Sequence, residues 1–194
     1  YGGDRDNVVL VGQSAGAHLC ALVLLRGAVH WRPNDLRGFV GISGPYHVPA
    51  TAAHWRARGF GQAMLDFIFG DEAGMLMASP SYLAARAEDV ELPPMLLLHG
   101  TADKSATAQS TLDFAAALED LGVDVQTKLY EGWTHTDPIL ERPFAGDQRL
   151  HRDLLEAVSK WCDGPVASFS DDTPGLGRLC PQVLIELGRR CMPF

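Results

Sequence analysis

The junction between a short apolar run and a serine flanked by glycines constrains this chain more than any other feature. Val8 to Val11 are apolar and mostly β-branched, which predicts a buried strand, and the residues after Gly16 predict a helix. Between them lies Gly12-Gln13-Ser14-Ala15-Gly16, with the Gly-x-Ser-x-Gly spacing of a nucleophile elbow. We expect both glycines to be required, because a Cβ at either position would collide with neighbouring backbone in so tight a turn.

The elbow predicts how Ser14 is presented. The turn exposes Ser14 Oγ at the carboxyl end of the sheet and aims the Ala15 N–H, at the positive end of the new helix, towards an oxyanion. Small residues also form ordinary turns between a strand and a helix. The hypothesis of a reactive serine therefore needs further residues in support.

The rest of the chain alternates between apolar runs and helical patterns. We predict a helix over 17–26, a strand over 36–43, an insertion over 46–92, a strand over 95–98, a helix over 107–121, a strand over 123–130 and a helix over 150–161. This order is typical of an α/β fold with a mostly parallel sheet between helices. The insertion is expected to form a cap.

We predict one catalytic domain over 1–162, and 46% hydrophobic residues suffice for its core. Residues 163–194 are expected to form an irregular tail with a short helix at 182–187. The chain begins at Tyr1 and runs almost at once into the first strand. We therefore expect the N-terminal strands of the sheet upstream, and an unpaired apolar edge at 8–11 in this chain alone.

A nucleophilic serine needs a base, and the base needs an acid to orient it. In this kind of fold the order is Ser, then Asp or Glu, then His, each on a loop after a strand. Asp103 follows the strand at 95–98, and His135 follows the strand at 123–130. The sequence therefore predicts a triad of Ser14, Asp103 and His135, with Asp137 as the alternative acid.

The predicted chemistry is acyl transfer to water, with Ala15 N–H as one oxyanion donor. The second donor normally comes from an upstream glycine-rich loop, so these residues alone are expected to be a weak catalyst. No metal-ligand spacing is seen, and the chemistry needs neither metal nor cofactor. A net charge of −8 argues against a nucleic-acid surface, and the sequence shows no apolar stretch of transmembrane length and no signal peptide.

Several segments together resemble the isoprenylcysteine α-carbonyl methylesterases. They are the elbow with Ala17-His18, the run 97–103 (LLHGTAD), the segment 130–137 (YEGWTHTD), and the stretches 37–44 and 54–59. The likeness covers roughly residues 1–160. It implies an α/β-hydrolase that demethylates the carboxyl-methylated prenylcysteine of lipidated proteins, with catalytic roles for Ser14, Asp103 and His135.

The resemblance also implies a small-molecule or lipidated-peptide ester as substrate. It implies endomembrane localisation, in the endoplasmic reticulum or Golgi, through segments absent from this chain. Trp133 stands where the family suggests a basic residue, and we expect it to be a pocket wall. His47 and Trp55 in the insertion are further candidates for substrate contact, although we favour simple packing for most apolar residues of the insertion.

Two alternatives stay open. One is a general carboxylesterase or an arylformamidase-like hydrolase with the same triad. The other is a catalytically weak, truncated homologue that acts as a binding protein.

Overall fold

The core of the molecule is a four-stranded parallel sheet. In the computed structural model, which describes residues 3–26, 35–88, 90–164 and 180–191, its strands are β1 (Val9–Gln13), β2 (Gly38–Ile42), β3 (Met95–Gly100) and β4 (Val125–Tyr130). They lie in the order β1-β2-β3-β4, and each pairs in parallel with the next. Parallel strands require crossover connections, and here each crossover carries at least one helix.

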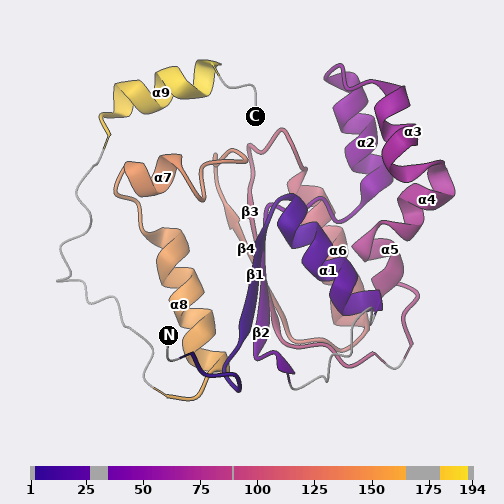
Figure 1. The fold of residues 1–194 in the computed structure, drawn as a ribbon. Helices are drawn as coiled ribbons and strands as arrows, with labels where there is room; N and C mark the ends of the chain where they lie inside the picture. Colours follow the sequence, from indigo (N-terminus) through magenta and orange to yellow (C-terminus); the bar gives the residue numbers. More distant parts are fainter. Residues whose placement is uncertain (1–2, 27–34, 89, 165–179, 192–194) are drawn as a thin grey trace.

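Helices connect and cover the strands (Figure 1). Their bounds are α1 (Ala15–Arg26), α2 (Val48–Ala57), α3 (Gln62–Phe69), α4 (Glu72–Met77), α5 (Pro80–Ala84), α6 (Ala108–Asp120), α7 (Glu141–Phe144), α8 (Arg149–Trp161) and α9 (Gln182–Cys191). In Figure 1 the sheet is seen nearly edge-on, with α1 and α6 on one side and α8 on the other. The sheet is therefore the middle layer of three.

Alternate strand residues supply the two faces of the core. Phe39 and Leu97 point towards the cluster formed with α1 and α6, which includes Phe114. Their chain neighbours Val40 and Leu98 point towards the cluster formed with α8. Because both faces are covered, β2 and β3 are buried at every position and appear in the sequence as continuous apolar runs.

The predicted fold class is confirmed, and the predicted strands differ from the observed ones only at their ends. The insertion between β2 and β3 consists of the four short helices α2 to α5, and the short α7 was not predicted from the sequence. The helix predicted in the tail is present and runs on to Cys191. Residues 165–179 and 192–194 of the predicted irregular tail lie outside the described residues.

Strand β1 forms an outer edge of the described sheet, and Val11 on it is 51% exposed. This agrees with the apolar edge expected at 8–11. Cys20, Cys162 and Cys180 are free thiols. Within the described ranges, none of the helices is long and apolar enough to cross a membrane.

Candidate active site

Ser14 lies on a sharp turn between β1 and α1. Its φ is +54°, a left-handed conformation that is uncommon for a residue with a side chain, and the turn is held by a 2.8 Å hydrogen bond from Ser14 N to the Ile42 carbonyl oxygen. Helix α1 begins at the next residue, Ala15. The Ala15 N–H is thus among the first amides of a helix, which have no partner within the helix and can face a developing negative charge.

The two glycines of the elbow have different roles. A Cβ on Gly12 would lie 2.7 Å from the Ala17 nitrogen and from the Gly16 carbonyl group, so this position excludes any side chain. A Cβ on Gly16 would meet nothing within 4 Å. The expectation that both glycines are sterically required is therefore correct for Gly12 and wrong for Gly16, where the turn leaves open space.

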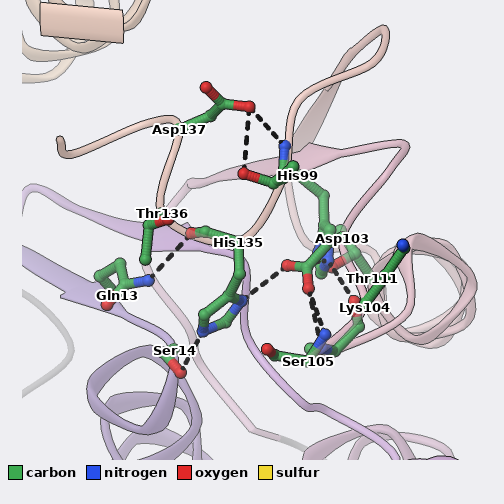
Figure 2. Close-up of polar contacts among 12 residues, drawn as sticks. Gln13, Ser14, His99, Asp103, Lys104, Ser105, Thr111, His135, Thr136 and Asp137 are labelled. Carbon is green, nitrogen blue, oxygen red and sulfur yellow. Dashed lines mark hydrogen bonds and ion pairs between the residues drawn. The ribbon is translucent and has the colours of Figure 1, made fainter. Parts of the chain in front are cut away.

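The structure brings Ser14, His135 and Asp103 together from three separate loops (Figure 2). His135 Nε2 lies 2.8 Å from Ser14 Oγ, and His135 Nδ1 lies 2.7 Å from Asp103 Oδ2. The His135 side chain is 12% exposed and the Asp103 side chain is fully buried. This is the geometry of a nucleophile, a base and an orienting acid in series.

Asp103 is held at both carboxylate oxygens. Oδ1 accepts hydrogen bonds from the backbone N–H groups of Ser105 at 2.7 Å and Ala106 at 3.0 Å. Oδ2 faces His135 and also His99, whose Nε2 lies 3.2 Å away. Burial alone would raise the pKa of Asp103, but the hydrogen bonds from the two histidines, the electrostatic effect of His135 and the Ala106 N–H together outweigh it and hold this pKa well below its usual range. Asp103 therefore stays ionised beside His135.

Asp137, the alternative acid, shapes the loop that carries His135 instead of contacting its ring. Asp137 Oδ2 accepts hydrogen bonds from Thr134 N at 2.7 Å and Thr134 Oγ1 at 3.1 Å, and Oδ1 pairs with Arg142. On the other side of the loop, Gln13 Nε2 lies 3.5 Å from the His135 carbonyl oxygen (Figure 2). The structure thus assigns the contact with the His135 imidazole to Asp103.

A largely apolar cavity of about 770 Å³ opens beside His135. The insertion supplies most of its wall, and the loops after β3 and β4 supply the rest; the lining includes Trp55, Phe60, Ile68, Phe69, His135 and Thr136. The charged Arg58 and the polar Ser105 also line the cavity. A ligand in this cavity would lie against the histidine that contacts Ser14.

Of the three candidate substrate contacts, the structure places only Trp55 in this cavity. His47 caps α2, where its Nδ1 accepts a hydrogen bond from Ala50 N, and it is not among the described residues that line the cavity. Trp133 is fully buried and stacks on Tyr130, with ring centroids 4.1 Å apart. The expectation of a pocket wall at Trp133 is corrected: its ring packs into the core between the sheet and α8.

Some residues of the site were not predicted from the sequence. The amides of Ser105 and Ala106 were detectable in principle, because an aspartate in a loop commonly binds backbone N–H groups two and three residues later. Arg58 carries no comparable signal, because it reaches the cavity only through the packing of the insertion. Throughout 3–26, 35–88, 90–164 and 180–191, no three His, Cys, Asp or Glu side chains are grouped so as to hold a metal ion.

His18 joins the elbow helix to the insertion. Its Nε2 lies 2.6 Å from the Ala78 carbonyl oxygen, and burial lowers the pKa of His18 more than this hydrogen bond raises it. The unfolded chain therefore binds a proton more readily than the folded one just below pH 6.5, and the free energy of unfolding should fall as the pH drops through that window.

This loss can be measured by urea unfolding at pH 7.5 and 5.5. His18→Gln is the matched variant, because an amide nitrogen at the same distance along the side chain keeps the donor but does not titrate. We expect a smaller loss of stability on acidification in His18→Gln than in the parent protein. An equal loss in both would show that His18 is not the group responsible.

Residues 1–137 match the sequence model of a family described by the alpha/beta hydrolase fold. Among curated relatives, a probable isoprenylcysteine alpha-carbonyl methylesterase from Oryza sativa subsp. japonica is 32% identical over the whole chain, which covers 50% of that protein. The isoprenylcysteine alpha-carbonyl methylesterase of Arabidopsis thaliana is 30% identical, again over the whole chain and 48% of that protein. The chain spans about half the length of these relatives.

Solved structures agree on the fold. The acylaminoacyl peptidase of Pyrococcus horikoshii superposes with a TM-score of 0.62 at 19% identity, over 86% of this chain and 26% of that one. At this identity the likeness concerns the fold alone. The resemblance to the methylesterases, in contrast, is found in the amino-acid sequence itself.

Proposed function

This chain belongs to the α/β-hydrolase fold family, and from that premise we propose that it is a serine carboxylic-ester hydrolase that demethylates isoprenylcysteine methyl esters. The observation that carries the proposal is the continuous path from Ser14 Oγ through the His135 imidazole to Asp103, with contacts of 2.8 and 2.7 Å. The substrate class is supported by the names of the curated relatives and by the apolar cavity beside His135.

In the proposed reaction, His135 Nε2 takes the proton of Ser14 Oγ as this oxygen attacks the ester carbonyl carbon. The Ala15 N–H donates a hydrogen bond to the oxyanion that forms. The tetrahedral intermediate collapses, the methoxy group leaves as methanol with the proton from His135, and an acyl-enzyme remains. A water molecule, deprotonated by His135, then attacks the acyl carbon. The bond from this carbon to Ser14 Oγ breaks, Ser14 takes back its proton from His135, and the product leaves as the free acid, which ionises to the carboxylate. Asp103 fixes the imidazole and stabilises its positive charge in both halves.

The cavity fits the acyl side of such a substrate. A prenylcysteine joins a long hydrocarbon to a carboxyl group through one short residue, so the ester carbon and the hydrocarbon lie close together. Trp55, Phe60 and Ile68 offer aromatic and aliphatic surface within reach of His135. Burial of hydrocarbon in such a cavity contributes free energy in proportion to the area removed from water.

We further propose that the substrate is reached at an endomembrane of the endoplasmic reticulum or Golgi. A prenylated substrate is itself lipophilic and concentrates in bilayers. The resemblance to the methylesterases supports this proposal.

The function is tested by comparing hydrolysis of farnesylcysteine methyl ester with that of p-nitrophenyl acetate. We expect kcat/KM to be higher for the farnesylcysteine ester, because only this substrate fills the apolar cavity. A preference for the acetate ester would favour a general carboxylesterase. No hydrolysis of either ester would favour a binding protein.

Two adjacent residues of α3 test the role of the cavity. Ile68 lines the cavity, whereas Phe67 is 87% exposed and is not among its described lining residues. Ile68→Asp should raise KM for farnesylcysteine methyl ester about tenfold, because the charge opposes burial of hydrocarbon, and should leave hydrolysis of p-nitrophenyl acetate unchanged. Phe67→Asp, the matched control, should change neither. Equal effects of both variants would contradict binding of the prenyl group in this cavity.

A further inference from the structure

A second histidine contacts the carboxylate on which His135 depends. His99 is the penultimate residue of β3, and its side chain is fully buried. Figure 2 draws it together with Asp103 and His135. Asp103 thus contacts one imidazole from the loop after β4 and another from β3, the strand that precedes it, and only the first has a part in the reaction described above.

The partners of His99 determine which of its ring nitrogens carries a proton. Nε2 lies 3.0 Å from the Ala106 carbonyl oxygen and 3.2 Å from Asp103 Oδ2. Both are acceptors, so Nε2 carries hydrogen. Nδ1 lies 2.7 Å from Thr111 Oγ1 on α6, and a hydroxyl can either donate or accept. His99 is therefore neutral if the Thr111 hydroxyl donates to Nδ1, and positively charged if this hydroxyl accepts from Nδ1.

Electrostatics favours a neutral His99. The side chains of His99 and Asp103 are both fully buried, and Thr111 is buried as well. Asp103 already balances the positive charge that His135 acquires when it takes the proton of Ser14. A second imidazolium on the same carboxylate would leave a net positive charge in the protein interior, which is costly. The Thr111 hydroxyl then donates to Nδ1, and the neutral ring donates from Nε2.

We propose that His99 is a positioning residue for Ser14, His135 and Asp103. Thr111 holds it as the neutral tautomer with hydrogen on Nε2. In this form His99 orients Asp103 and limits the negative charge that Asp103 presents to His135. The inference rests on the proposed function. With two donors at Oδ2, the carboxylate is fixed in its plane and its charge is shared. Without the His99 donor, more of that charge would act on His135 and stabilise the imidazolium, because only the Ser105 and Ala106 N–H groups would share it.

The other charged or titratable groups around His135 do not change in the variants used below. Arg58 shares the cavity with it, His54 contacts the Lys104 carbonyl oxygen, and Asp137 pairs with Arg142. Any change in the titration of His135 on substitution of His99 can therefore be assigned to the contact with Asp103.

The tautomer is tested in the parent protein by ¹⁵N NMR of the histidine rings at pH 7. We expect His99 to show a protonated Nε2 and an unprotonated Nδ1. Thr111→Val, which removes the hydroxyl and keeps the shape, should perturb the Nδ1 resonance, and Thr111→Ser, which keeps the hydroxyl, should not. A protonated Nδ1 of His99 at pH 7 would overturn the proposal.

The effect of His99 on Asp103 and His135 is tested with two amide variants. His99→Gln places an amide nitrogen near the position of Nε2 and retains the donor to Asp103. His99→Asn places its amide near the position of Nδ1 and loses that donor. In His99→Asn, the fall of kcat/KM on the acidic side of its pH profile should shift to higher pH by roughly half to one pH unit. His99→Gln should keep the parent profile.

A merely structural role would lower the melting temperature of both variants without shifting the acidic side of the pH profile of kcat/KM. Absence of a shift in His99→Asn, or equal shifts in both variants, would therefore contradict the proposal. The same comparison can follow the His135 Cε1–H resonance against pH, which needs no turnover. An NMR shift in His99→Asn without any ester hydrolysis would refute the proposed function and leave the role of His99 standing.

Discussion

Ser14→Ala should abolish ester hydrolysis, with a decrease in kcat/KM of about 10⁴–10⁶-fold. The reason is that the attacking oxygen disappears while the rest of the site remains. Ser14 Oγ has His135 Nε2 as its partner at 2.8 Å, and the backbone of the elbow is held independently by Ser14 N and the Ile42 carbonyl oxygen. Alanine can take up the same left-handed φ as serine at similar cost, so we expect the melting temperature to stay close to that of the parent protein.

Ser43→Ala is the matched control for this experiment. Ser43 follows β2, the strand next to β1, and has a φ of +52°, close to that of Ser14. It is fully buried, and its Oγ has no hydrogen-bond partner among the residues that the structure describes. Ser43→Ala should therefore retain hydrolysis. Loss of activity in Ser43→Ala, or retained activity in Ser14→Ala, would contradict the assignment of Ser14 as the nucleophile.

The position of the site was predictable from the sequence because it depends on topology. Each of Ser14, Asp103 and His135 follows a strand, and parallel strands bring the loops at their carboxyl ends to one edge of the sheet. The predicted strands needed only their apolar runs to be recognised, since β2 and β3 are buried on both faces. Order along the chain and burial of strands are both visible in a single sequence.

The surroundings of the site were less predictable because they depend on packing between distant segments. Trp133 is next but one to His135 along the chain, yet its ring turns into the core and stacks on Tyr130. A loop residue next to a catalytic side chain gives no sign of which way its own side chain points. The contact of His99 with Asp103 likewise depends on the way the loop after β3 folds back on its own strand. The cavity depends on how α2 and α3 pack against the loops after β3 and β4.

The second large effect is expected at the first glycine of the elbow. Gly12→Ala should lower the free energy of unfolding by about 2–3 kcal/mol, because the added Cβ would lie 2.7 Å from the backbone of Gly16 and Ala17, and backbone atoms cannot move aside without opening the turn. For a chain of this length, this corresponds to a decrease in melting temperature of ~5–10 °C. Thermal unfolding followed by circular dichroism measures the change directly.

Gly16→Ala is the matched control and should have the opposite sign. A Cβ there would meet nothing within 4 Å, and Gly16 is the second residue of α1, where alanine is favoured over glycine by up to about 1 kcal/mol. The same substitution, four residues apart in one motif, should thus destabilise the first position and stabilise the second. Equal destabilisation by both would mean that the turn is tighter around Gly16 than the structure has it. A mild effect of Gly12→Ala would mean that the elbow can open without loss of the fold, and the left-handed φ of Ser14 would then not be enforced by the backbone behind it.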